Sequence, residues 1–121
     1  MSLWIMVAGP YSAGGAGAAE RAANLADMNR VARRLFALGH VPVIGVNMAL
    51  PVIAAGEAEG ETDAYGAIMM PLSLALADRC DAVLRIGGAS GGADAEVERF
   101  EASGKPVYRS LEEIPAVEIN A

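Results

Sequence analysis

One glutamate and two glycine-rich segments are the parts of this chain whose residue types and spacing point to chemistry. The segments are Gly9-Pro10-Tyr11-Ser12-Ala13-Gly14-Gly15 and Gly87-Gly88-Ala89-Ser90-Gly91-Gly92. Glycine lets the backbone approach a ligand closely and turn its N–H groups outward. Glu96 follows the second segment in the first turn of a predicted helix, so its carboxylate can point back toward a ligand held by those amides.

A carboxylate in that position can attack or stabilise the anomeric carbon of a sugar, as in retaining glycoside hydrolysis. Two structural readings stay open for Glu96: a helix-start glutamate favoured by the helix dipole, and an ion pair with Arg99 on the same helix.

The glycine-rich segments also have a structural alternative, as tight connections between strands and helices. Neither segment contains G-x-x-x-x-G-K-[ST], and G-x-G-x-x-G is absent after the first predicted strand. P-loop nucleotide hydrolysis and Rossmann dinucleotide binding therefore lose their usual support.

Short apolar runs bounded by turn residues predict the strands, and apolar spacings of three and four residues predict the helices. The expected strands are 3–8, 41–44, 82–86 and 106–108, and the expected helices are 18–38, 71–79 and 93–103, with at most one helical turn at 111–114. The second helix is expected to begin at Pro71, because proline suits a first turn and breaks a helix interior; a longer kinked helix from residue 62 is the alternative. Segment 45–60 is expected to be mobile or to cover a ligand, with a short helix near 50–55.

This alternation of strands and helices predicts one α/β domain over residues 1–121. We expect a three-layer, Rossmann-like or flavodoxin-like fold, with a parallel sheet of roughly four or five strands in the order 2-1-3-4-5. Ligands of such sheets bind beyond the carboxyl ends of the strands. Both glycine-rich segments follow a predicted strand, so we expect them to line one site.

The composition narrows the choice of partners. The chain has 121 residues, a formal net charge of −6, one cysteine (Cys80) and one histidine (His40). The negative charge argues against a nucleic-acid polymer as partner, and the single cysteine and histidine exclude an internal disulfide and a Cys/His zinc site. Without a membrane-spanning apolar run or a signal-peptide pattern, we expect a cytoplasmic protein with no membrane partner. The apolar helix at 71–77 predicts an interface in a homodimer or homotetramer.

Five motifs in order resemble the nucleoside 2-deoxyribosyltransferase superfamily. They are Ala8-Gly9-Pro10-Tyr11-Ser12, Gly39-His40, Cys80-Asp81-Ala82-Val83-Leu84, Gly88-Ala89-Ser90-Gly91-Gly92-Ala93-Asp94-Ala95-Glu96 and Gly104-Lys105-Pro106-Val107. Their order and spacing cover most of residues 3 to 108, and the ordered set is more specific than any one motif. The chain is most similar to small members described as domains of unknown function, and next to the 2′-deoxynucleoside 5′-phosphate N-hydrolases.

The resemblance implies an enzyme that cleaves or exchanges the N-glycosidic bond of a nucleoside 5′-monophosphate, with no metal or organic cofactor. It implies that Glu96 is the nucleophile and that Ser90, six residues earlier, contacts the 5′-phosphate with help from the backbone amides of Gly91 and Gly92. It also implies that one loop lies along the sugar and base, namely Gly9, Pro10, Tyr11 and Ser12. Within that loop, Tyr11 either stacks on the ligand or packs against its neighbours.

One position departs from the family pattern. Family enzymes usually carry an aspartate eight residues before the aspartate that leads into the third strand; here that position is Ser73, counted back from Asp81. A hydroxyl cannot replace a carboxyl as proton donor near neutral pH. A second reading is therefore a non-catalytic nucleotide-binding domain of the same fold. A third, a phosphoribohydrolase of the cytokinin-activating type, fits less well, because Pro-Gly-Gly-x-Gly-Thr is absent and Ala93 stands where the threonine would help.

The remaining polar residues carry narrower expectations. His40 is expected to be structural, Cys80 to be buried and inert, and Asp94 to cap a helix. Asn47 is expected either to form a turn or to reach the ligand. Arg85, on an otherwise buried strand, is expected near the strand end or paired with an acidic residue at an interface.

Overall fold

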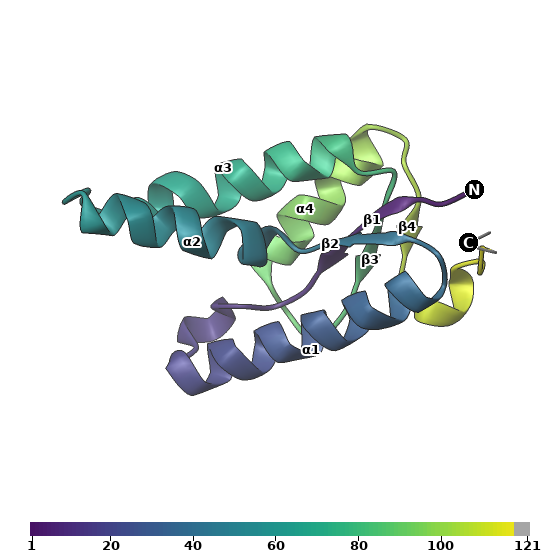
Figure 1. Ribbon diagram of the computed structural model, residues 1–121, viewed down its shortest axis with the longest axis horizontal. Coiled ribbons are helices and arrows are strands. Elements are labelled where there is room, and N and C mark those ends of the chain that lie inside the picture. The colour runs from purple at the N-terminus through teal and green to yellow at the C-terminus, as the bar shows by residue number, and fades with distance from the viewer. Residues whose placement is uncertain (118–121) are drawn as a thin grey trace.

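Four parallel strands form the centre of the molecule (Figure 1). The computed structural model describes residues 1–117. The strands are β1 (Trp4–Ala8), β2 (Val41–Val43), β3 (Ala82–Arg85) and β4 (Val107–Tyr108), arranged in the order β2-β1-β3-β4. The predicted parallel sheet and the order of its first four strands are confirmed, and the described residues contain no fifth strand.

Helices cover both faces of the sheet and produce a Rossmann-like, three-layer fold (Figure 1). They are α1 (Ala18–Ala37), α2 (Gly45–Ala58), α3 (Ala64–Arg79) and α4 (Gly91–Ala102), with short 3-10 helices at Ala13–Gly15 and Leu111–Glu113. α1 packs on one face, and α3 and α4 pack on the other. α2 and α3 run side by side and extend beyond the sheet (Figure 1). Within residues 1–117, no helix combines the length and apolar character needed to cross a membrane.

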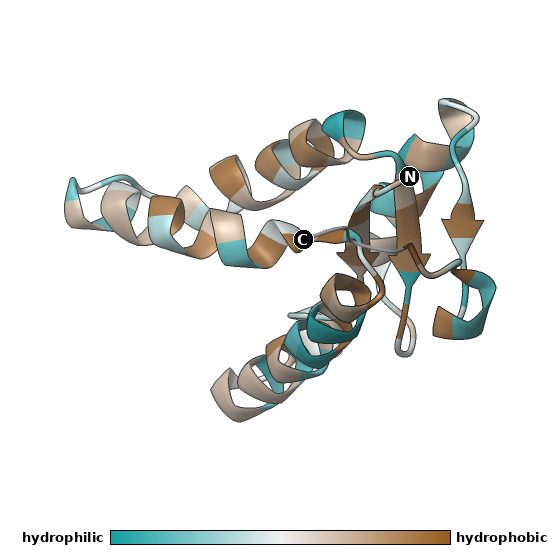
Figure 2. Ribbon diagram, turned by 45° about the vertical axis from the view of Figure 1, so that its right-hand side comes forward, coloured by the Kyte–Doolittle hydropathy of each residue, from teal (hydrophilic) through white to brown (hydrophobic). Residues whose placement is uncertain are grey.

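The two central strands, β1 and β3, are buried on both faces, so their side chains supply two separate cores. Ile5 and Val7 of β1 belong to the cluster that includes α1. Met6 and Ala8, which point the other way, belong to the cluster that contains Phe100 of α4. The strands accordingly appear brown at the centre of the molecule in Figure 2. Burial on both faces explains why the strand sequences are continuous apolar runs rather than alternating patterns.

The segment after β2 is a regular helix, which corrects the expectation of a mobile or ligand-covering stretch with a short helix near 50–55. α2 is 14 residues long and continues through Pro51. This proline lacks the N–H that would bond to a carbonyl in the preceding turn. Ala49 and Ile53, however, are buried in a cluster shared with α3. The packing of two helices against each other therefore outweighs one missing hydrogen bond.

α3 also begins before its proline. It starts at Ala64, and the side chain of the N-cap residue Asp63 accepts a hydrogen bond from the Gly66 N–H at 3.1 Å. The predicted start at Pro71 is wrong, and the longer helix is the correct alternative. Ala64 and Met69 are buried in the cluster shared with α2, so tertiary packing again sustains a helix that proline weakens.

His40 has the structural role predicted for it. Its side chain is 2 % exposed. Nδ1 accepts a hydrogen bond from the Leu3 N–H at 3.0 Å, and Nε2 donates to the carbonyl oxygen of Pro115 at 2.7 Å. The ring thus joins the start of β1 to the end of the described chain.

The thiol of Cys80 is expected to resist modification, because burial raises its pKa to about 11. At pH 8 we expect the native protein to react with a soluble aromatic disulfide at least about 100-fold more slowly than the chain unfolded in urea. Two pKa units correspond to about a 100-fold smaller thiolate fraction, and burial also limits access. The reaction is followed by absorbance, and equal rates in the two states would contradict this prediction.

Candidate functional site

The two glycine-rich segments leave the sheet side by side. β1 and β3 pair in parallel and end opposite each other, so the loops that follow begin at the same level. A Cβ on Gly9 would lie 3.0 Å from Cγ1 of Ile86, and one on Gly87 would lie 2.7 Å from Cδ of Pro10. Gly87 also has a φ of +75°, where other residues are strained. Glycine is needed at these positions because the loops touch.

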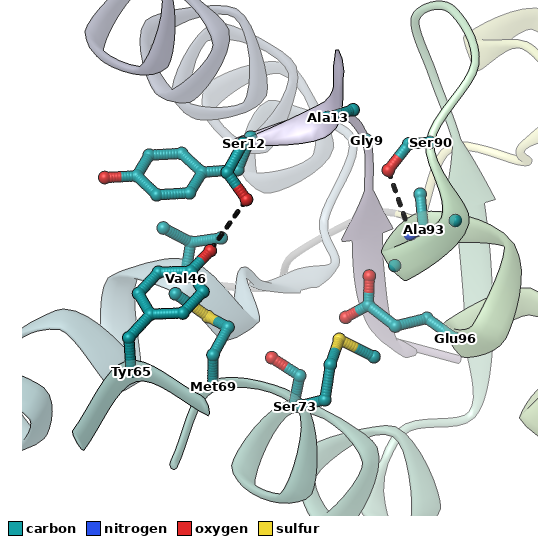
Figure 3. Close-up of a pocket in the computed structure, with 14 residues that line it drawn as sticks. Gly9, Ser12, Ala13, Val46, Tyr65, Met69, Ser73, Ser90, Ala93 and Glu96 are labelled. Atoms are coloured by element: carbon teal, nitrogen blue, oxygen red, sulfur yellow. Dashed lines mark hydrogen bonds between the residues drawn. The ribbon is translucent and has the colours of Figure 1, made fainter. Parts of the chain in front are cut away.

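A pocket of about 260 Å³ lies between these loops and α3 (Figure 3). Of the residues predicted for the site, it is lined by Gly9, Tyr11, Ser12, Ser90, Gly91, Gly92 and Glu96. The other lining residues are Ala13, Val46, Tyr65, Met69, Met70, Ser73 and Ala93. Among these described residues only Glu96 carries a charge. The volume lies near the lower limit of small-molecule sites.

The Glu96 carboxylate points into the pocket from the second turn of α4 rather than from the predicted first turn, because the helix begins at Gly91 (Figure 3). The residue is 8 % exposed, and this burial raises its pKa to about 7. The positive charge of Arg85 opposes the increase. Arg99, the alternative partner predicted for Glu96, instead donates two hydrogen bonds to Asp78 at 2.8 and 2.9 Å. The carboxyl group is therefore about half ionised near neutral pH and faces ligand space.

Ser90 begins α4 and defines one corner of the pocket. Its hydroxyl accepts a hydrogen bond from the Ala93 N–H at 3.1 Å, as an N-cap side chain does (Figure 3). A hydroxyl that accepts one bond still has its own proton to donate. The N–H groups of Gly91 and Gly92 occupy the first two helical positions, where no partner exists within the helix. This corner can bind an anion or a strong acceptor.

Asp94 and Arg85 form an ion pair behind the same loop. The predicted capping role of Asp94 is wrong, because Ser90 is the N-cap and Asp94 lies in the first turn. Its carboxylate lies 3.3 Å from the guanidinium of Arg85, which is the last residue of β3 and 9 % exposed. Arg85 thus lies at the strand end, as expected, and its acidic partner belongs to the same chain.

The wall opposite Glu96 comes mainly from α3. Tyr65, Met69 and Ser73 follow one another at intervals of four residues and so share a helix face. The hydroxyls of Tyr65 and Ser12 are hydrogen-bonded at 2.8 Å across the pocket (Figure 3). Tyr65 and Met69 were not predicted from the sequence, because the expected helix began at Pro71. Extending that helix to residue 64 would have revealed the spacing.

Two predicted site residues lie outside the pocket. Asn47 is in the first turn of α2, and its side chain donates a 2.7 Å hydrogen bond to Asn29 of α1. It lines a separate groove that also includes Trp4. Pro10 packs on the second loop at Gly87 and does not line the pocket. Pro10 therefore holds the loops together, and the structure does not bring Asn47 to the site.

Gly45, the first residue of α2, is expected to be essential for the shape of the α3 wall. A Cβ there would lie 2.2 Å from Oγ and 2.9 Å from Cβ of Ser73. Gly45→Ala should therefore displace Ser73 and lower the free energy of unfolding in urea by about 1–3 kcal/mol. Gly91→Ala is the matched control, since Gly91 is the first residue of α4 and a Cβ there meets nothing within 4 Å. Equal stability of the two variants would contradict the close contact.

The fold and the pocket define the class of protein: a Rossmann-like α/β domain with a small-molecule-sized pocket at the carboxyl edge of its sheet. A family model described as a domain of unknown function (DUF1937) matches residues 4–112, and the chain belongs to this family. No curated protein and no solved structure gave a match. The matched region includes every residue that lines the pocket.

In the described part of the chain, no group of three or more His, Cys, Asp or Glu residues is placed to hold a metal ion.

Proposed function

We propose that this protein cleaves the N-glycosidic bond of a nucleoside 5′-monophosphate, or exchanges its base, with Glu96 as the nucleophile. The observation that carries the proposal is the Glu96 carboxylate, which is 8 % exposed, faces the pocket and lies on the helix that begins with Gly91 and Gly92. Burying a carboxylate is unfavourable unless it is compensated. A buried carboxyl with a raised pKa in a pocket is typical of a catalytic group.

Glu96 acts in its ionised form. A carboxylate oxygen attacks C1′ of the sugar, the bond between C1′ and the base nitrogen breaks, and its electron pair leaves with the base. The intermediate is an ester between Glu96 and the sugar. Water or the nitrogen of a second base then attacks C1′, the carboxylate is released, and the proton of the attacking group passes to solvent or to the departed base. A water attack completes hydrolysis, whereas attack by a base completes transfer.

The pocket has chemically different ends that suit a nucleotide. At the start of α4, the Ser90 hydroxyl and the N–H groups of Gly91 and Gly92 are available to phosphate oxygens, and this kind of site needs no basic side chain. On the α3 wall, Tyr65 and Met69 offer an aromatic ring and a thioether to the flat face of a base. A nucleotide bound in this orientation has its sugar between the two ends, facing Glu96.

Ser73 influences how the base departs. It stands where enzymes of the superfamily that the chain resembles usually carry an aspartate, and a serine hydroxyl does not protonate a leaving base at neutral pH. The proton must then come from water, or the base must leave as an anion. We therefore expect slow turnover and a preference for bases that form the most stable anions.

The proposal is tested by incubating the protein with a panel of ribonucleoside and 2′-deoxyribonucleoside 5′-monophosphates and measuring the free base by chromatography. Base release proportional to protein concentration supports the proposal. If no member of the panel loses its base, the catalytic proposal is wrong.

A nucleotide-binding domain without catalysis is the second candidate, and Ser73 favours it because the missing acid removes part of the chemistry but leaves the pocket. Thermal unfolding in the presence of the same panel distinguishes the two candidates. A ligand at about 100 times its dissociation constant stabilises the folded state by about 2.7 kcal/mol. A nucleotide that stabilises the protein without losing its base would support the binding function.

A further inference from the structure

Arg85 makes an unusual set of contacts for a buried charge. It ends β3, is 9 % exposed, and directs its guanidinium at the loop that follows it. Nη1 donates to the carbonyl oxygen of Ile86, and Nη2 donates to that of Gly88 at 2.8 Å. Nε and Nη2 also donate to Oδ1 of Asp94, each at 3.3 Å. One side chain thus connects a strand end, the glycine-rich loop and the first turn of α4.

These contacts lie on the side of the loop away from the candidate pocket. Arg85, Gly88 and Asp94 border a different hollow, which Arg109 also lines, and none of these residues lines the candidate pocket. The carbonyl oxygens of Ile86 and Gly88 are therefore directed away from the space where a ligand would bind. A carbonyl oxygen turned into that space would repel a phosphate, whereas an N–H would attract it.

We propose that Arg85 is a positioning residue for phosphate recognition. It holds the carbonyl oxygens of Ile86 and Gly88 on the far side of the loop that joins β3 to α4, so that the free N–H groups at the start of α4 face the pocket. The inference rests on the proposed function, because it assigns the phosphate of that nucleotide to this loop. Glycine-rich backbone has many accessible conformations, so a fixed orientation needs an external constraint. The guanidinium supplies it, since its planar fork of donors bonds several oxygens at once, which a lysine ammonium does not match.

The positive charge of Arg85 adds a second contribution. It lies close enough to lower the pKa of Glu96, opposing the effect of burial. A phosphate dianion bound beside a carboxylate benefits from the same charge. Asp94 offsets only part of it, because this carboxylate is 62 % exposed and screened by water.

The test compares Arg85→Met and Arg85→Lys with Arg109→Met, which removes the other arginine of the hollow. Binding of 2′-deoxynucleoside 5′-monophosphates and of the matching nucleosides is measured by calorimetry. We expect Arg85→Met to raise the Kd of the nucleotide about tenfold and that of the nucleoside less than about twofold, with Arg85→Lys in between. A general loss of structure would weaken both ligands alike. Arg109→Met should match the wild type.

Amide hydrogen exchange in the loop provides a second measurement that needs no nucleotide. Arg85→Met should accelerate exchange of the Gly88 to Gly92 amides. In the wild type we expect inorganic phosphate to slow exchange at Gly91 and Gly92, and Arg85→Met should abolish this protection. If nucleotide binding depends on Arg85 but the wild type releases no base, only the catalytic function is overturned. Equal Kd ratios and equal exchange in wild type and Arg85→Met would overturn only the role of Arg85. If Arg85→Met does not fold, Arg85→Lys decides by the same criteria.

Discussion

Glu96→Gln is expected to lower the rate of base release at least about 10³-fold, because the amide oxygen is a much poorer nucleophile than a carboxylate oxygen. The substitution preserves the shape of the side chain, so the pocket and its ligand affinity should survive. In the wild type, kcat/KM should rise with pH and level off above about pH 7, since the nucleophile must lose its proton. Glu98→Gln, on the exposed side of the same helix, is the matched control and should retain full activity.

Chemical rescue distinguishes a nucleophile from a group that only positions the substrate. Glu96→Ala removes the carboxylate and leaves space for a small anion such as azide. Azide nitrogen would then form the bond to C1′, the base would depart with its electron pair, and a glycosyl azide would accumulate. Detection of this adduct by mass spectrometry supports direct attack by Glu96. Base release by Glu96→Gln at the wild-type rate would remove Glu96 from the mechanism altogether.

The same carboxyl should make the protein less stable as the pH rises. Its pKa is raised in the folded state to about 7, above the ordinary value of 4.5. Below pH 4.5 the group is protonated in both states and contributes no difference. Between pH 4.5 and 7 the unfolded chain loses this proton first, so the unfolded state gains and the stability falls. At about 1.4 kcal/mol for each pKa unit, the full loss above pH 7 is roughly 3 kcal/mol.

Glu96→Gln should remove this loss, because glutamine does not ionise. We expect the stability of the variant relative to wild type to increase by about 3 kcal/mol between pH 4 and pH 8, measured by urea unfolding at each pH. Glu98→Gln, an exposed substitution, should stay within about 0.5 kcal/mol of wild type throughout. A relative stability of Glu96→Gln that does not change with pH would show that the carboxyl is accessible to water in the folded protein.

Glu96→Gln is therefore expected to lose activity and to escape the loss of stability that the wild type undergoes as the pH rises. A chain selected for stability alone would place a neutral residue at a position that is 8 % exposed. A carboxyl retained there at a loss of about 3 kcal/mol above neutral pH favours a functional role.

The strands, the parallel sheet and one side of the pocket were predictable from the amino-acid sequence. Continuous apolar runs such as Leu3 to Ala8 predicted strands buried on both faces, and the alternation with helices predicted a parallel sheet in the observed order. The two glycine-rich segments were expected at one sheet edge because both follow strands, and β1 and β3 do end together. Glu96 was found through its place after the second segment. Local signals sufficed for the strands and helices themselves, and the general rules for strand–helix–strand connections supplied the placement of the strands.

Tertiary packing decided the other half of the pocket. α2 and α3 each continue through a proline because burial of residues such as Ile53 and Met69 between them outweighs a lost backbone bond. Only the resulting longer α3 brings Tyr65 to the site, and a hydrogen bond to Asn29 of α1 holds the Asn47 side chain outside it. The role of Arg85 likewise depends on carbonyl directions that no residue pattern reveals. Composition and periodicity report which side chains prefer to be buried, whereas the wall of a site depends on which buried surfaces meet.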